Sequence, residues 1–382
     1  MTISRETLDE LTTLELRPAV SILMPTHHAG PEIRQDPIRF KNLVREVEHK
    51  FAARDLGKAE IAQITGPAHP LIDDRAFWRH QQQGLAVYAA PNFFRSYWAP
   101  RPFREIASIS DHFHVTQLFS SLVDSTRFYV LALSQKDIRL IEATRTSAAE
   151  VDLGNLPRSL AEALSTEPPG QELQQHVVTT AGGERGVMFH GHGAGLLDQR
   201  KEAIRQFFHQ LDHGLPSLLP DRHAPLVLAG VEYLLSIYRE ANSHPAVLPE
   251  GIAGNPEQES AQTLGSRGWE IVSRHLEAAE ARTVTRYEER AGLGRVSADL
   301  VTVVRATYEG RVEELFVADG AERWGTFEPG SGAVTVRDKP GSVGEDLINL
   351  AAIQAFQRGG AIHVLERSQV PAAADIAAIF RY

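Results

Sequence analysis

The sequence predicts an α/β protein made of three successive α/β domains, at residues 1–125, 126–265 and 266–382. Short apolar runs typical of buried strands alternate with segments of helical periodicity along the whole chain. The length of 382 residues points to more than one hydrophobic core, because domains usually hold roughly 100–200 residues. A composition with 42% apolar and 23% charged residues is that of an ordinary globular protein.

The first domain is expected to open on a buried strand at residues 19–24, which Pro25 ends. A long helix follows from Ile38, because four apolar residues recur at near-helical spacing. These residues are Ile38, Leu43, Val47 and Phe51. A second strand is predicted at residues 85–90, with residues 93–98 as its hairpin partner.

The middle domain is predicted to hold a mixed sheet with helices on its faces. Strand-like runs at residues 127–133 and 137–143 are joined by a short polar turn, a third run ends at Leu153, and another follows at residues 226–229. Three strands, then a helix and a further strand, favour this arrangement.

One helix of this domain is predicted from Asp198 to His213, with Asp198 as its N-cap and Gly214 as its C-terminal glycine. Its apolar stripe has the i, i+3, i+4, i+7 spacing of a core-facing helix. The stripe consists of Ile204, Phe207, Phe208 and Leu211. Residues 244–265, rich in Pro and Gly, are expected to be a long loop leading to a hinge.

The last domain is predicted to be a compact α/β/α sandwich. Helices are expected at residues 269–290, 297–309 and 346–358, and strands at residues 312–318 and 362–365. Ser297 is the expected N-cap of the second helix, Gly310 follows its end, and Gly359-Gly360 stops the third helix.

Charge and composition exclude several functional classes. The chain has no cysteine, which excludes a disulfide framework, a thiolate zinc site and a cysteine nucleophile. Neither a secretory signal nor an apolar run of the ~20 residues needed to cross a bilayer is present, so we expect a cytoplasmic protein that binds no membrane. The net charge of −10 argues against non-specific nucleic-acid binding by the whole chain.

A local excess of positive charge stands out against this acidic background. Seven basic residues face four acidic ones between Arg34 and Lys58, on the predicted long helix. A solvated helix face explains this pattern, and so does contact with RNA phosphates. The candidate RNA-binding residues of this segment are Arg34, Arg39, Lys41, Arg45, Lys50 and Arg54.

A glycine-rich loop directly before the predicted helix at Asp198 is the candidate catalytic segment. Three glycines in five residues allow close approach to a ligand, and a helix N-terminus behind them offers free N–H groups to an anion. The spacing completes neither a P-loop nor a dinucleotide-binding fingerprint. The loop consists of His190, Gly191, His192, Gly193, Ala194 and Gly195.

Other catalytic patterns are absent. His209 and His213 fall opposite the apolar stripe of their helix and are expected to face solvent, so we predict no metal site and no cofactor. Possible nuclease carboxylates have no spacing that ties them together. They are Asp124, Asp137, Glu142 and Glu232. No Gly-x-Ser-x-Gly motif marks a serine hydrolase.

In their order along the chain, these segments resemble the bacterial archaeo-eukaryotic release factor proteins, a branch of the peptide-chain release and ribosome rescue factor superfamily. The resemblance covers nearly the whole chain. Residues 20–25 with the basic helix and residues 83–88 are similar to the N-terminal domain, and residues 128–143 to the opening hairpin of the middle domain. Residues 344–360 and 377–382 resemble the C-terminal domain.

The resemblance implies an RNase H-like middle domain, a C-terminal sandwich related to kink-turn-binding ribosomal proteins, and a tRNA mimic that binds the ribosome, with rRNA and peptidyl-tRNA as partners. It further implies that the segment around His190 to Gly195 corresponds to the loop that carries Gly-Gly-Gln in release factors. Gly193-Ala194-Gly195 lacks the glutamine, as do the rescue factors, and no Asn-Ile-Lys-Ser motif for stop-codon decoding is present. On this basis we expect RNA contacts from Lys201 and Arg205 as well.

Two other functions remain open at this stage. A hydrolase would use His190 and His192 as base or metal ligands, and a non-catalytic scaffold would bind basic partner proteins through its acidic surface.

Overall fold

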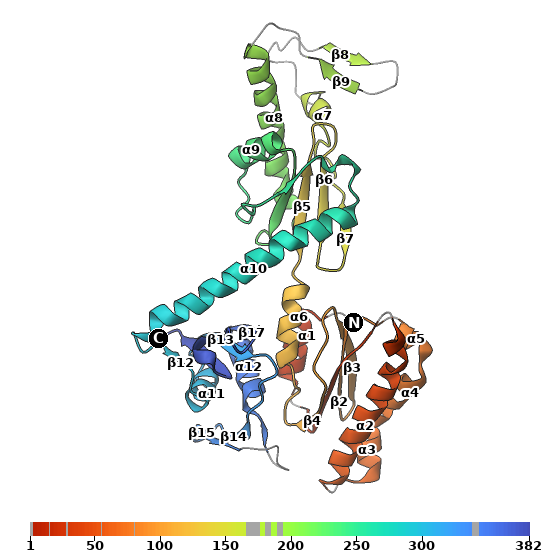
Figure 1. The fold of residues 1–382 in the computed structure, drawn as a ribbon, viewed down its shortest axis with the longest axis vertical. Helices are drawn as coiled ribbons and strands as arrows, with labels where there is room; N and C mark the ends of the chain where they lie inside the picture. The colour runs from red at the N-terminus through yellow and green to blue at the C-terminus, as the bar shows by residue number, and fades with distance from the viewer. Residues whose placement is uncertain are drawn as a thin grey trace. The chain divides into compact units, whose positions relative to one another are not determined.

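The computed structural model describes residues 3–14, 16–27, 30–54, 56–79, 81–165, 176–179, 185–188, 194–337 and 344–382. The chain forms two compact units. Unit 1 joins the two ends of the sequence, Met1–Ser125 and Ala279–Tyr382, and unit 2 is Thr126–Ala278. Both are mixed α/β structures, as expected. Figure 1 shows their elements.

The N-terminal part of unit 1 is a four-stranded antiparallel sheet with strand order β3-β2-β1-β4. The strands are β1 (Ala19–Pro25), β2 (Gly84–Ala90), β3 (Phe93–Ala99) and β4 (Ile106–Ser110). The predicted strand and hairpin are confirmed, and Asn92 with φ 62° forms the tight turn between β2 and β3. Helices α1 (Arg5–Thr13) and α6 (Thr116–Asp124) also belong to this part.

Helix α2 (Asp36–Ala52) covers one face of this sheet with a buried stripe at positions i, i+3, i+4, i+7 and i+11. The stripe consists of Phe40, Leu43, Val44, Val47 and Phe51. The predicted helix is confirmed, but Ile38 is 60% exposed and does not belong to the stripe. Helices α3 (Lys58–Thr65), α4 (His69–Asp73) and α5 (Arg75–Arg79) complete this layer.

The C-terminal part of unit 1 has a sheet of strand order β12-β18-β13-β17 and the helices α11 (Leu300–Tyr308) and α12 (Leu347–Gln357). Its strands are β12 (Val296–Ser297), β18 (Ile376–Phe380), β13 (Val312–Ala318) and β17 (Ala361–Leu365). The predicted strands and helices of this part are confirmed. The predicted N-cap Ser297 is wrong, because Ser297 lies in β12 and Asp299 Oδ2 accepts the Thr302 N–H at 2.8 Å.

A small sheet of order β15-β14-β16 was not foreseen from the sequence. Its strands are β14 (Trp324–Glu328), β15 (Ala333–Val336) and β16 (Glu345–Asp346). These strands are short and mostly half-exposed, so their hydrophobic pattern is weak.

Unit 2 holds a mixed sheet, as the sequence predicts; it has five strands in the order β11-β10-β5-β6-β7, of which β11 was not predicted. Strands β5, β6 and β7 are antiparallel, whereas β10 runs parallel to β5. The strands are β5 (Phe128–Leu133), β6 (Arg139–Ala143), β7 (Ala148–Val151), β10 (Leu226–Gly230) and β11 (Ile252–Ala253). A separate hairpin joins β8 (His176–Thr179) to β9 (Arg185–Met188).

Helices cover both faces of this sheet (Figure 1). One face packs against α7 (Leu160–Ser165), α8 (Ala194–Gly214) and α9 (Glu232–Ala241), and the predicted stripe of α8 is buried there. Helix α8 begins at Ala194, so Asp198 lies inside the helix and is not its N-cap. Gly214 is the last residue of α8, as predicted, and its φ of −86° is not left-handed.

The other face packs against the start of α10 (Ala261–Ala291). The predicted loop over residues 244–265 is therefore wrong in part, because it contains β11, a 3₁₀ turn (Pro256–Gln258) and the first turn of α10. Within the described ranges, no helix is long and apolar enough to span a membrane.

Candidate nucleic-acid interface

Three of the predicted RNA-binding residues of the first segment are tied to other protein groups. Arg39 Nε lies 2.8 Å from Glu105 Oε1, and Arg39 Nη1 lies 3.4 Å from the buried Asp36 Oδ1. Lys50 Nζ pairs with Glu46 Oε1 at 2.7 Å and donates to the Ala107 carbonyl, and Arg54 donates to the Ile109 carbonyl at 3.3 Å. These three side chains connect α2 and its C-terminal turn to the β4 region and are less available to a ligand.

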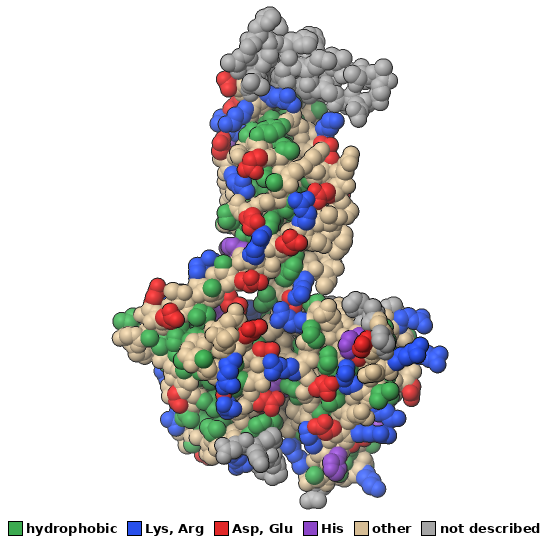
Figure 2. All heavy atoms as spheres, viewed as in Figure 1, with side chains coloured by type: hydrophobic (Ala, Val, Ile, Leu, Met, Phe, Trp, Pro, Cys, Tyr) green, Lys and Arg blue, Asp and Glu red, His purple; other side chains and the backbone are tan. Residues whose placement is uncertain are grey.

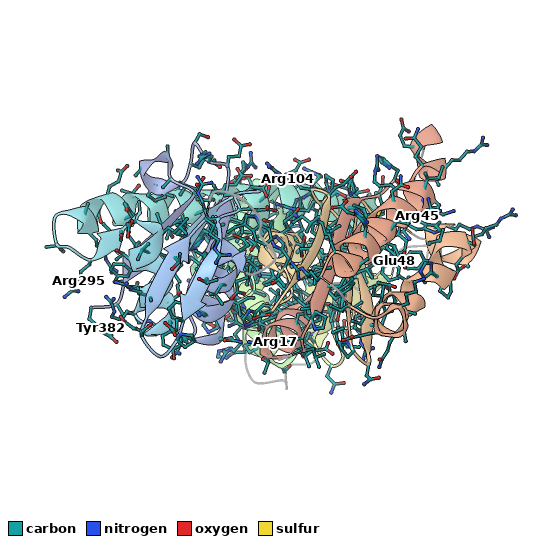
Figure 3. The ribbon with its side chains drawn as sticks, turned by 90° about the horizontal axis from the view of Figure 1, so that it is seen from below. Arg17, Arg45, Glu48, Arg104, Arg295 and Tyr382 are labelled. Atoms are coloured by element: carbon teal, nitrogen blue, oxygen red, sulfur yellow. The ribbon has the colours of Figure 1, made fainter. Side chains whose placement is uncertain are left out.

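The other three, Arg34, Lys41 and Arg45, are exposed. None of them forms an ion pair with another residue that the structure describes. Lys41 and Arg45 lie four and eight residues after Pro37 on α2, so their side chains follow one another along one side of the helix. Figure 3 shows Arg45 at the outer side of unit 1, on α2 with Glu48.

Helices α4 and α5 add cations that the sequence analysis missed. Arg75 and Arg79 are exposed and, within the described part of the chain, have no carboxylate partner. They line a pocket of about 500 Å³ whose other walls are mostly apolar. These walls are formed by Ile33, Pro37, Ile72, Asp73 and Trp78. Helix α5 has only five residues, so its two arginines form no repeating pattern that the sequence analysis could recognise.

We call Arg34, Lys41, Arg45, Arg75 and Arg79 the α2–α5 cationic surface. Figure 2 shows Lys and Arg side chains on this side of unit 1. The pocket lies at the N-terminal end of α2, because Pro37 lines it, and Lys41 and Arg45 continue from there. The arrangement offers separate positive charges along one face, which suits an extended polyanion.

Unit 2 carries the remaining predicted RNA-binding residues, Lys201 and Arg205, on α8. Lys201 Nζ is 3.9 Å from Glu240 Oε2, and Arg205 pairs with Glu202 at 2.7 Å on the same helix. Lys201 and Arg200 line a pocket of about 620 Å³ between α8 and α9. Ile204, Tyr233, Ser236 and Ile237 form its other walls.

Arg200 and Tyr233 are both held by Gln135. Arg200 donates to Gln135 Oε1 at 2.7 Å, and the Gln135 amide donates to the Tyr233 hydroxyl. Tyr233 is nevertheless 50% exposed. Arg200 and Tyr233 were not predicted, because they come together only when α8, α9 and the end of β5 pack.

Most of the candidate catalytic loop lies outside the described part of the chain. His190, Gly191, His192 and Gly193 lie outside the described residues, and Ala194 and Gly195 are the first two residues of α8. His209 and His213 are exposed, as predicted. In the portions of the chain described, no group of three His, Asp or Glu side chains could hold a metal ion.

The carboxylates considered for a nuclease have separate roles. Asp124 is buried and accepts from Arg101, and Glu142 contacts Arg127 and the Tyr129 hydroxyl. Asp137 lines a polar pocket beside Arg139, and Glu232 is the first residue of α9.

The family model for bacterial archaeo-eukaryotic release factor family 3 matches residues 127–311. Among solved structures, the archaeal translation termination factor aRF1 is 13% identical, covers 100% of this chain and 99% of its own, and gives a TM-score of 0.24. Archaeoglobus fulgidus Pelota is 13% identical, with 100% and 93% covered and a TM-score of 0.33. Dom34 of S. cerevisiae is 9% identical, with 78% and 73% covered and a TM-score of 0.37. No curated protein matches the sequence.

Proposed function

We propose that the protein is a cytoplasmic, ribosome-associated translation factor that binds rRNA through the α2–α5 cationic surface. The match of residues 127–311 to the model of bacterial archaeo-eukaryotic release factor family 3 supports this proposal. As part of this proposal, unit 2 is an RNase H-like domain. Its three antiparallel strands followed by the parallel strand β10, with helices on both faces, support that assignment. We also propose three domains at residues 1–125, 126–265 and 266–382, of which the first and last share the core of unit 1.

The observation that carries the proposal is the set of cations without acidic partners on an acidic protein. The chain has a net charge of −10, yet Arg34, Lys41 and Arg45 make no ion pair within the described ranges. The guanidinium and ammonium groups of these three exposed residues are therefore available to a ligand. RNA phosphates supply the missing negative charge, and their binding releases counterions.

The sequence around the loop limits the chemistry of the proposed factor. Gly193-Ala194-Gly195 lacks the glutamine of the release-factor motif, so we propose a role closer to rescue factors, without stop-codon decoding. Lys201 and Arg205, which follow this segment in the sequence on α8, would then contact RNA.

Co-sedimentation of the full chain with 70S ribosomes across a salt series tests the proposal. We expect binding that weakens steeply as salt rises, and a variant with Lys41→Glu and Arg45→Glu should bind weakly at every salt concentration. The matched control reverses two exposed cations of unit 2, Lys136→Glu and Arg222→Glu, which changes the net charge equally. Equal binding by the α2 variant and wild type would contradict the RNA-binding surface. Failure of wild type to bind empty or stalled ribosomes would contradict the function itself.

A further inference from the structure

Four arginines from distant parts of the sequence come together at one edge of unit 1. Arg295 precedes β12, Arg311 precedes β13, Arg358 caps α12 and Arg381 follows β18. The Phe380 N–H donates to the Arg295 carbonyl at 2.9 Å, and the Arg381 N–H donates to the Arg311 carbonyl at 2.8 Å. We call these four residues the arginine cluster.

The side chain of Arg381 holds the cluster together. Its Nη1 donates to the Gly310 carbonyl at 3.0 Å, and its Nη2 donates to the Arg358 carbonyl at 2.9 Å. These carbonyls lie at the C-terminal ends of α11 and α12, where backbone acceptors have no partner within the helix. The Arg381 guanidinium therefore joins the C-terminal ends of α11 and α12 and brings Arg311 and Arg358 close to each other.

The positive charges of the cluster are mostly not neutralised. Arg311 pairs with Glu309 at 2.6 Å, but among the residues with described positions no carboxylate pairs with Arg295, Arg358 or Arg381. The Arg358 guanidinium lies 5.5 Å from the centre of the Tyr308 ring, which supports it without removing its charge.

The cluster has an exposed aromatic ring beside it. Tyr382 directly follows Arg381 and is 71% exposed. Figure 3 shows Arg295 and Tyr382 at the same edge of unit 1, on the side away from Arg45. The cluster is therefore separate from the α2–α5 cationic surface.

We propose that the arginine cluster is a second RNA-binding surface, in which Arg295 and Arg358 contact phosphates and Tyr382 stacks on a base. Guanidinium groups bind phosphate oxygens through two parallel hydrogen bonds, and single-stranded RNA is bound by cations combined with stacking rings. An acidic peptide would also neutralise the arginines, but it has no use for the exposed ring. This inference rests on the proposed function, because it takes RNA as the partner.

Fluorescence anisotropy with a labelled 20-nucleotide single-stranded RNA, measured over a potassium chloride series, tests it on the full chain. The variant with Arg295→Gln and Arg358→Gln removes two phosphate contacts, so the slope of log affinity against log salt should fall by about 1.4. Arg295→Lys with Arg358→Lys should keep the wild-type slope. Tyr382→Ala should weaken binding by at least about 5-fold with little change in slope.

Two further variants separate the possible failures. Lys136→Gln with Arg222→Gln removes the same charge from unit 2 and should bind as wild type does. Lys41→Gln with Arg45→Gln tests the α2–α5 cationic surface.

If that variant lowers the salt slope and the arginine-cluster variant does not, the second surface is overturned while the proposed function stands. If wild type binds no RNA, the proposed function is contradicted. Binding of a poly-glutamate peptide that is lost only in the cluster variant would assign the surface to an acidic protein and overturn the RNA assignment.

Discussion

His363 lies between two carboxylates in the C-terminal part of unit 1. Its Nε2 is 2.7 Å from Glu314 Oε2 and its Nδ1 is 3.8 Å from Glu280 Oε1, while its ring stacks on Phe316. Burial by itself lowers the pKa of His363, but the two carboxylates outweigh it and raise the pKa to about 9. The charged histidine thus connects α10 to β13 and β17.

This arrangement predicts that unit 1 loses stability in mild alkali. The folded-state pKa of His363, about 9, lies above the ordinary value of 6.5. The stabilisation is therefore complete below pH 6.5 and is lost as the pH rises through 9. The difference between these two pKa values corresponds to a contribution of at most about 3 kcal/mol to the free energy of unfolding. Hydrogen exchange of the β13 and β17 amides between pH 6 and 10 measures it.

The variant His363→Gln has no titrating ring and should be less stable than wild type at pH 6 but similar at pH 10. A wild-type stability that stays constant from pH 6 to 10 would contradict the role assigned to the charged ring.

At the scale of elements, α10 shows how close packing decides where a helix can lie. Gly268 faces the sheet of unit 2, and a Cβ atom placed there would lie 2.8 Å from Phe128 Cε2 and 2.8 Å from Val130 Cγ2. Glycine usually disfavours the interior of a helix. Here its missing side chain lets α10 pack directly on β5.

Gly268→Ala should therefore destabilise unit 2, although alanine forms helices better. Crowding against two buried side chains should cost about 1–3 kcal/mol, against a helix-propensity gain of about 1 kcal/mol. Denaturant unfolding followed by Trp269 fluorescence measures the change, because Trp269 packs on Phe128.

The neighbouring exposed substitution Ser266→Ala provides the control and should stabilise the same helix by a few tenths of a kcal/mol. If Gly268→Ala were as stable as Ser266→Ala, the close packing of α10 on β5 would be refuted.

At the scale of the whole molecule, the two ends of the sequence share one hydrophobic core in unit 1. Asn349 of α12 connects them, because its Oδ1 accepts the Val115 N–H at 2.8 Å and the Thr116 hydroxyl at 3.0 Å, and its Nδ2 donates to the Phe113 carbonyl at 2.9 Å. The N-cap residue of α6, Val115, supplies no side-chain hydrogen bond. Asn349 therefore supplies the hydrogen-bond acceptor for donor groups at the start of α6, although Thr116 lies 233 positions earlier in the sequence.

Asn349→Ala should leave these buried groups without partners and destabilise unit 1 by about 2–4 kcal/mol. Hydrogen exchange measured by mass spectrometry should increase in both Met1–Ser125 and Ala279–Tyr382. Asn42→Ala, at an exposed position of α2, should leave exchange unchanged. An increase confined to the C-terminal segment would show that the two ends of the chain fold independently.

The periodic parts of the fold could be predicted from the sequence. Ten elements have hydrophobic patterns that reflect their own burial: strands β1, β2, β3, β5, β6 and β13 and helices α2, α8, α11 and α12. Such patterns can be recognised without knowledge of distant residues. The helix ends were less predictable. Asp198 and Ser297 have the residue types of an N-cap, but α8 begins at Ala194 and Asp299 caps α11.

The sequence by itself determined the α/β class, the local excess of cations between Arg34 and Lys58, the lack of a Gly-Gly-Gln motif and the family resemblance, which the match over residues 127–311 confirms. These properties depend on neighbours along the chain. Only the tertiary structure decided which cations are free and which are paired, because Arg39 meets Glu105 and Lys50 meets the Ala107 carbonyl through contacts across the fold. The arginine cluster is of the same kind, since strand pairing brings residues 295, 311 and 381 together and the Arg381 side chain joins them to residue 358.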